Sequence, residues 1–219
     1  TQMVSADRSD TVNFEYVADV EEQIDYSYNF AQSIGRNTLN GPEVLQPFET
    51  NIAHRIFHPV RIQRILFKGG KVEFMAKGGR LDNGHNSLDA VIVYNQDPVN
   101  KAYKRIKSFK LLTDYFYAGP ANDFYGNPVS EADRNRLKLT GVQEMGADNA
   151  VVKSHQFDYN ATRLPHVHSF AQDKWGYFNG KESNRSLLES QNVVINSSTN
   201  PTTVSIGMDG FTDRGADRS

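Results

Sequence analysis

Short runs in which apolar and polar residues alternate recur along the chain, and they constrain its fold more than any other feature. Residues 11–17 place Val12 and Phe14 on one face, and residues 23–30 repeat the pattern with Tyr28 and Phe30. Alternation with a period of two is typical of a half-buried β-strand. About ten strands are expected on this criterion, and no stretch has the period of a long helix. The sequence therefore predicts an all-β fold of antiparallel hairpins with one or two short helices.

Glycines and polar residues separate these runs. Residues 60–68 and 71–77 flank Gly69 and Gly70, which indicates a hairpin whose turn needs positive φ at both glycines. A change of phase near Gln63 indicates a bulge there or a strand that is buried on both faces. The remaining expectations are a hairpin across residues 19–22, a long surface loop over 32–51, a helical turn at 130–135, a short helix within 181–191, and strands at 193–195 and 203–208.

A weak internal repeat occupies the middle of the chain. Residues 80–111 and 136–160 each read as strand, polar turn and strand, and each begins with an Arg-Leu pair. Such hairpins cannot bury their apolar faces alone, so we expect them to stack or wrap into an extended sheet or shell wall. We interpret residues 1–219 as a single β-rich segment of a larger polypeptide, with possible sub-units at 1–58 and 59–180 and a trailing part at 181–219.

Composition excludes several classes of protein. The formal net charge is −2, with both signs interspersed, which gives no electrostatic case for nucleic acid as a partner. The longest apolar runs fall far short of the roughly 20 residues that a membrane helix needs, so no membrane insertion is expected. The chain has no cysteine, which excludes disulfides, thiol catalysis and thiolate metal sites.

Residues 171–180 contain the only tryptophan of the chain, together with further aromatic residues, glycines and a carboxylate. We expect the side chain of Asp173 to accept a main-chain hydrogen bond from Gly176 or Tyr177 and so to lock a turn. Trp175 is interpreted as a plug in the core, so that its replacement by alanine would cost about 3–5 kcal/mol. The sequence thus predicts a structural corner made by Asp173, Trp175, Gly176, Tyr177, Asn179 and Gly180.

Functional interpretations of the same region remain open. Trp175 and Tyr177, with Asp173 beside them, are a candidate sugar-binding platform, because aromatic faces stack on flat polar ligands. Asp173 is also a candidate catalytic carboxylate, although no second acid has a suitable spacing. His166 and His168 share a face if they lie on a strand, which makes them candidate metal ligands with Asp173.

Established catalytic motifs are absent from the sequence. It contains no nucleophile elbow, no P-loop, no dinucleotide-binding glycine pattern and no His-Glu-x-x-His motif. The histidines and acids named above are therefore weighed only as candidates. We expect a protein that is not an enzyme, with no catalytic residues and no cofactor.

The order of several motifs resembles a known family. The motifs are Arg-Leu-Lys-Leu-Thr-x-Val-x-Glu at 136–144, Phe157-x-Tyr159-Asn160, Leu164-Pro165, and Ala-Gln-Asp-x-Trp-Gly-Tyr-x-Asn-Gly at 171–180. Together they resemble a segment of large secreted proteins of Bacteroidetes-type bacteria that lies beside Rhs/YD repeats. The tyrosine-aspartate repeat itself has only a distant counterpart here, at residues 157–159.

This resemblance implies a location and a role. It implies a secreted or cell-surface β-scaffold that encloses or presents another domain, or that is carried as cargo of a secretion machine. The implied partners are neighbouring β repeats of the same parent chain and secretion or surface-display machinery. The alternative from the residues themselves is a carbohydrate-binding β-sandwich that uses Trp175 and Tyr177.

Overall fold

The computed structural model describes residues 1–219 except 20–22, 37–42, 47–48, 124–125, 174, 189–190, 197–200 and 207–219. The described chain is antiparallel β-sheet with one short helix, α1 (Glu131–Arg134), so the all-β prediction is confirmed. Turns rather than a helix occupy residues 181–188, and the expected second helix is wrong there. No helix in the described ranges is long and apolar enough to cross a membrane.

The chain forms two compact units that are interleaved in sequence. Unit 1 comprises residues 1–23, 56–117 and 131–163, and unit 2 comprises residues 24–55, 118–130 and 164–219. Neither unit is a continuous stretch. This division is therefore of a different kind from the consecutive sub-units expected from the sequence, which stay a prediction.

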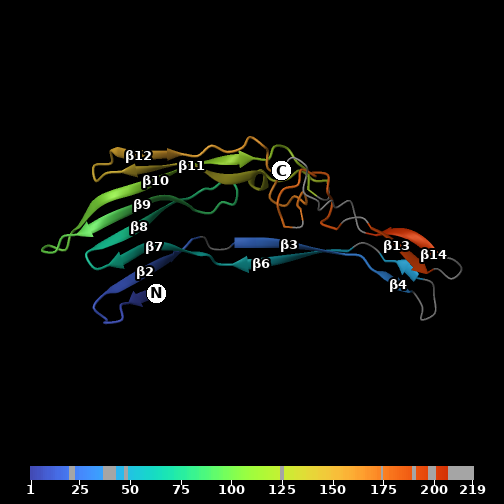
Figure 1. Ribbon diagram of the computed structural model, residues 1–219, viewed down its shortest axis with the longest axis horizontal. Coiled ribbons are helices and arrows are strands. Elements are labelled where there is room, and N and C mark those ends of the chain that lie inside the picture. Colours follow the sequence, from blue (N-terminus) through green and yellow to red (C-terminus); the bar gives the residue numbers. More distant parts are fainter. Residues whose placement is uncertain are drawn as a thin grey trace. The chain divides into compact units, whose positions relative to one another are not determined.

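Unit 1 contains an eight-stranded antiparallel sheet (Figure 1). Short turns join its strands at one end, whereas the segments that belong to unit 2 leave from the other end. In spatial order the strands are β1 (Gln2–Val4), β2 (Thr11–Ala18), β7 (Val60–Phe67), β8 (Gly70–Lys77), β9 (Ser87–Gln96), β10 (Tyr103–Tyr117), β11 (Asn135–Met145) and β12 (Val151–Gln156).

The predicted β7–β8 hairpin is confirmed, with a different turn. Phe67 pairs with Gly70, so the turn is made by Lys68 and Gly69. Only Gly69 has a positive φ, at 82°, and Gly70 is already the first residue of β8. Gly70 has another reason to be glycine, because a Cβ there would meet the Tyr94 carbonyl oxygen at 2.6 Å. The bulge expected near Gln63 is confirmed as a register shift between β2 and β7.

One row of cross-strand neighbours in the sheet is apolar. The cross-strand pairs place Phe14, Ile65, Val72 and Val93 in one row that crosses four strands. The next row contains Glu15, Arg64 and Glu73. It lies on the opposite face, because pairs in a ladder share a face and successive residues alternate. The buried hydrophobic residues of the described chain all lie in unit 2: Ala118, Val129, Phe170, Ala171 and Ile195. The apolar row of the sheet is therefore only half-buried.

Unit 2 consists of two-stranded ribbons and loops. β3 (Gln23–Ala31) pairs with β6 (Glu49–Phe57), β4 (Ile34–Arg36) with β5 (Glu43–Leu45), and β13 (Gln191–Asn196) with β14 (Pro201–Ile206). The hairpin expected across residues 19–22 is wrong, because β2 pairs with β1 and β7 while β3 pairs with β6. The long loop expected over residues 32–51 is also wrong, because β4, β5 and the start of β6 lie there. The two strands expected after residue 190 are confirmed.

An aromatic cluster forms the apolar centre of unit 2. The ring of Phe170 packs edge-on against Tyr28 and Phe30, with centroid distances of 5.3 and 5.0 Å. Phe170 is 7% exposed, and the following residue, Ala171, is fully buried. The segment that enters the predicted corner is thus anchored to β3 by Phe170.

The loop at residues 78–86 ties distant strands of unit 1 together. Asn86 Nδ2 donates to the main-chain oxygen and to Oδ1 of Asp19, at 2.8 and 2.7 Å, which connects the start of β9 to the end of β2. Asp82 accepts two hydrogen bonds from Arg80, at 2.9 and 2.7 Å, and one from the N–H of Leu137 at 3.1 Å. Through these polar contacts the loop is bonded to β11 and to the end of β2, which lie on opposite sides of it in the strand order of the sheet.

Acid is expected to weaken this loop. Burial alone would raise the pKa of Asp82, but hydrogen bonds from Arg80 and Leu137 hold the pKa below its ordinary value. A carboxyl whose pKa is lower in the folded state contributes stability above its unfolded pKa, and that stability is lost as the pH falls through the folded value. We expect the free energy of unfolding of unit 1 to fall below about pH 4. Asp82→Asn should remove part of this dependence in urea titrations at several pH values, and an unchanged acid dependence would contradict the prediction.

Candidate functional site

The corner at residues 171–180 is a hairpin held by Asp173, whose side chain is almost fully buried. Asp173 Oδ1 accepts hydrogen bonds from the N–H groups of Trp175 and Tyr177, both at 2.9 Å. The main-chain N–H of Asp173 donates to the main-chain oxygen of Tyr177 at 2.8 Å. The N–H of Gly176 donates to the main-chain oxygen of Asp173 at 3.0 Å. The predicted turn-locking role is confirmed for Tyr177, whereas Gly176 bonds to the main chain of Asp173 instead of its carboxylate.

Gly176, Asn179 and Gly180 complete the corner. Gly176 and Gly180 have φ values of 84° and 76°, in the region that favours glycine. Asn179 is 3% exposed, and its amide donates to the Gln172 oxygen at 2.9 Å while accepting from Lys181 N–H at 2.9 Å. The two glycines thus allow the main chain to turn, and Asn179 provides hydrogen-bond partners for main-chain groups of the corner.

A second hairpin of unit 2 has the same construction, which the sequence analysis missed. The N–H of Asp123 donates to the main-chain oxygen of Asn127 at 2.8 Å, and the N–H of Gly126 donates to the main-chain oxygen of Asp123 at 3.0 Å. The carboxylate Oδ1 of Asp123 accepts from the N–H of Asn127 at 2.8 Å. Gly126 has a φ of 85°. The shared signal is Ala-x-Asp-x-x-Gly, which begins at Ala121 in one hairpin and at Ala171 in the other. The corner is therefore one of two copies of a turn device.

The interpretation of Trp175 as a core plug is wrong. The Trp175 side chain is 73% exposed and that of Tyr177 is 58% exposed. In a tight hairpin the residues at the tip point away from the main-chain bonds, and here the apolar anchor is the preceding Phe170. The corner therefore presents two aromatic rings on its surface.

The histidines do not join Asp173 in a metal site. The main-chain oxygen of His166 accepts from Ser169 N–H at 3.1 Å, and the His168 ring lies 6.2 Å from that of Tyr28. The Asp173 carboxylate is used by the turn. In the part of the chain that the structure describes, no three histidine or acidic side chains are grouped as metal ligands.

Removing the Asp173 carboxylate is expected to loosen the corner. Asp173→Ala leaves the N–H groups of Trp175 and Tyr177 without their acceptor, and hydrogen bonds to a charged group contribute about 1.5–3 kcal/mol each. We expect a loss in this range from the free energy of unfolding of unit 2, with a smaller loss for Asp173→Asn, which keeps an acceptor oxygen. Amide hydrogen exchange at Trp175 and Tyr177 measures both effects. Equal losses for the two variants would contradict the proposed geometry.

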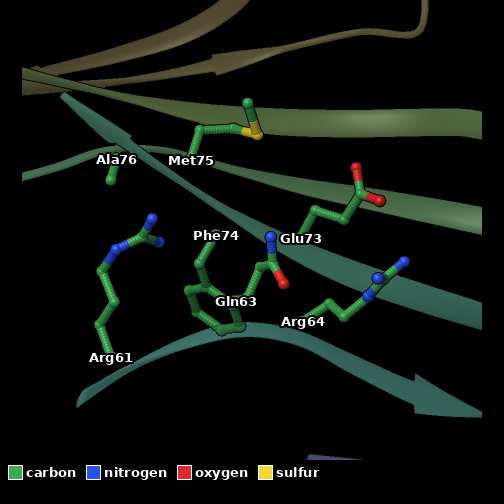
Figure 2. A pocket seen from close by; sticks show the side chains of 7 residues that line it. All are labelled: Arg61, Gln63, Arg64, Glu73, Phe74, Met75 and Ala76. Carbon is green, nitrogen blue, oxygen red and sulfur yellow. The ribbon is translucent and has the colours of Figure 1, made fainter. Parts of the chain in front are cut away.

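The structure adds a pocket that the sequence analysis did not anticipate. It has a volume of about 340 Å³ and lies between β7 and β8 of unit 1 (Figure 2). Arg61 and Gln63 reach toward it from β7, and the ring of Phe74 reaches toward it from β8. Its lining residues are Arg61, Gln63, Arg64, Glu73, Phe74, Met75 and Ala76. The only sequence signal for it is the change of phase at Gln63.

Charges of both signs surround this pocket. Arg64 forms an ion pair with Glu15, and Arg61 Nε lies 3.1 Å from Asp19 Oδ1. Lys71 Nζ donates to Glu73 at 2.6 Å, and this hydrogen bond lowers the pKa of the Glu73 carboxyl. The Nε of Arg61 is shielded from solvent, and its contact with the Asp19 carboxylate is an ion pair without a hydrogen bond. The charges around the pocket thus come in pairs of opposite sign, and the Arg61 guanidinium among the lining residues is held by Asp19.

No protein-family model, no curated protein and no solved structure matches this chain.

Proposed function

We propose that this chain is a non-enzymatic structural segment of a large exported bacterial protein of the kind that carries Rhs/YD repeats. Its role would be to enclose or present another domain, or to travel as secretion cargo. In this proposal the sheet of unit 1 continues into neighbouring β repeats of the same parent chain and forms part of a wall. Secretion or surface-display machinery would be the other partner, at the cell surface or outside the cell.

One of the two edge strands of the sheet, β12, is the observation that carries this proposal. β12 pairs only with β11 in the described sheet, and all six of its residues are exposed. Val151 and Val152 are 52% and 72% exposed there. An exposed apolar edge strand is a template for pairing with another strand, and proteins normally protect such edges. A further β repeat of the parent chain that pairs with β12 would cover this exposed edge.

Edge pairing predicts a specific behaviour of the isolated chain. We expect it to self-associate through β12, and Val152→Lys should weaken this association about tenfold, because a charge on an edge strand opposes pairing. Val99→Lys is the matched control, since Val99 is 89% exposed but lies in the turn between β9 and β10. Sedimentation velocity over a range of concentrations measures both variants. In a longer polypeptide the amides of β12 should be protected from exchange, and rapid exchange there would overturn the proposal.

The exposed rings of the corner favour a second candidate function, carbohydrate binding. Trp175 and Tyr177 sit on a turn that Asp173 holds in a fixed shape, and rigid aromatic faces are suited to stacking on sugar rings. Trp175 is the only tryptophan, so its fluorescence reports this site alone. Saturable changes in emission on titration with soluble glycans, abolished by Tyr177→Ala, would establish this function. The absence of any change would reject it and leave the structural proposal unaffected.

A further inference from the structure

The sheet of unit 1 is split along part of its length. In the described strands, the ladder between β7 and β8 runs from the Phe67–Gly70 pair to the Arg64–Glu73 pair and ends there. β7 nevertheless stays paired with β2 as far as Val60, and β8 stays paired with β9 as far as Lys77. Residues 60–63 and 74–77 therefore face each other without ladder pairs. We call the space between them the slot, and it contains the pocket of Figure 2.

The two sides of the slot are joined at both of its ends. At one end the four ladder pairs of the β7–β8 hairpin connect them. At the other end Asn86 bonds to Asp19, and these two hydrogen bonds are called here the Asn86–Asp19 clasp. The slot is thus an opening within the sheet, about four residues or roughly 13 Å long at 3.3 Å per residue. Its pocket of about 340 Å³ lies at the small end of the range for ligand sites.

The main chain around the slot suggests what it binds. Facing strand edges carry N–H and C=O groups at the repeat of an extended chain, and another extended chain can match them on both sides. The side chains add a second requirement. Arg61 contributes its guanidinium and Gln63 an exposed amide to the pocket lining, and both groups can donate hydrogen bonds to a carboxylate.

We propose that the slot binds a short extended peptide that carries an acidic residue. The main chain of the peptide adds a strand between β7 and β8, and its carboxylate binds Arg61. Asp19 is both the ion partner of Arg61 and the acceptor in the clasp, so the peptide carboxylate competes with Asp19 for Arg61 at the clasped end of the slot. A strand added between β7 and β8 widens the slot, and the clasp resists this widening.

The test uses the complete chain and two terminally blocked peptides, VEVT and VKVT in one-letter code. We expect calorimetry to give saturable binding of VEVT and about tenfold weaker binding of VKVT, because the charge-assisted hydrogen bond to Arg61 is lost. Amide exchange should slow at residues 60–63 and 74–77. Arg61→Gln should weaken VEVT binding to a similar degree. Arg36→Gln, which removes an exposed ion pair with Glu43 in unit 2, is the matched control and should leave binding unchanged.

Asn86→Ala is expected to strengthen peptide binding, whereas Arg61→Gln weakens it. Asn86→Ala removes the clasp without touching the pocket lining, so VEVT should bind several-fold more tightly than to the unaltered protein. Equal binding of VEVT and VKVT, protection at β12 instead of the slot, or no saturable binding even to Asn86→Ala at millimolar peptide would each overturn the proposal. If Arg61→Gln fails to fold, the comparison of the two peptides on the unaltered protein decides.

Discussion

Replacing Phe170 by alanine is expected to lower the free energy of unfolding of unit 2 by about 3–5 kcal/mol, the usual cost of deleting a buried aromatic side chain. The ring is 7% exposed and lies edge-on to both Tyr28 and Phe30, so its loss leaves a cavity at the centre of the unit. Hydrogen exchange of the Asp173 and Tyr177 amides measures the effect, because both bonds depend on the anchored corner. A loss below about 1 kcal/mol would mean that unit 2 is held elsewhere.

Trp175→Ala is the matched control for Phe170→Ala. Both substitutions remove a large aromatic ring from the same segment, but the Trp175 side chain is 73% exposed. Changes at exposed positions usually alter stability by no more than about 0.5 kcal/mol. We therefore expect Trp175→Ala to leave the exchange of the Asp173 amide nearly unchanged. A cost comparable to that of Phe170→Ala would restore Trp175 to the core.

Gly70→Ala is expected to have the second-largest effect, in unit 1. A Cβ at Gly70 would approach the Tyr94 main-chain oxygen to 2.6 Å and the ring of Phe67 to 2.8 Å. The ring can turn aside, but the carbonyl belongs to the neighbouring strand β9 and moves only with the ladder. Forcing an extra carbon into such a place costs about 1–3 kcal/mol. Urea unfolding followed by far-ultraviolet circular dichroism measures this loss.

Gly69, the adjacent glycine, is a control that distinguishes two reasons for a glycine, which are lack of space for a side chain and a positive φ. Gly69 has a φ of 82°, and nothing lies within 4 Å of a Cβ built there. Asparagine tolerates this conformation better than most residues, so Gly69→Asn should cost under about 1 kcal/mol. If both variants cost the same, the close approach at Gly70 is not what makes that position a glycine.

The local parts of the fold could be predicted from the sequence, whereas the pairing of distant strands could not. The β7–β8 hairpin and the bulge at Gln63 follow from alternation over a few residues and from nearby glycines. Alternation does not specify a partner strand, and nearness in sequence wrongly predicts a hairpin of β2 with β3. The structure pairs β2 with β7 instead, across more than forty intervening residues.

The candidate site shows the same division. The turn role of Asp173 depends on residues within four positions, and it was predictable. Which aromatic residue is buried depends on packing against β3, and so Trp175 was placed in the core and Phe170 was overlooked. The second Asp-x-x-Gly hairpin was readable from spacing, since Asp123 and Gly126 repeat Asp173 and Gly176. The slot depends on where one ladder ends, and strand patterns carry no such information.

The alternation of the chain between its two units bears on how such a protein can change length during evolution. The two unit 2 segments that return to the sheet, residues 24–55 and 118–130, leave it at the end opposite its short turns, and each lies between two strands that are neighbours in the sheet. An excursion such as residues 118–130 lies between two strands that are already paired, β10 and β11. Genetic insertions, deletions or exchanges within these two segments would leave the ladder intact. The loop at residues 78–86 lies at the same end of the sheet but has less freedom to diversify, because its bonds to Asp19 and Leu137 depend on its length.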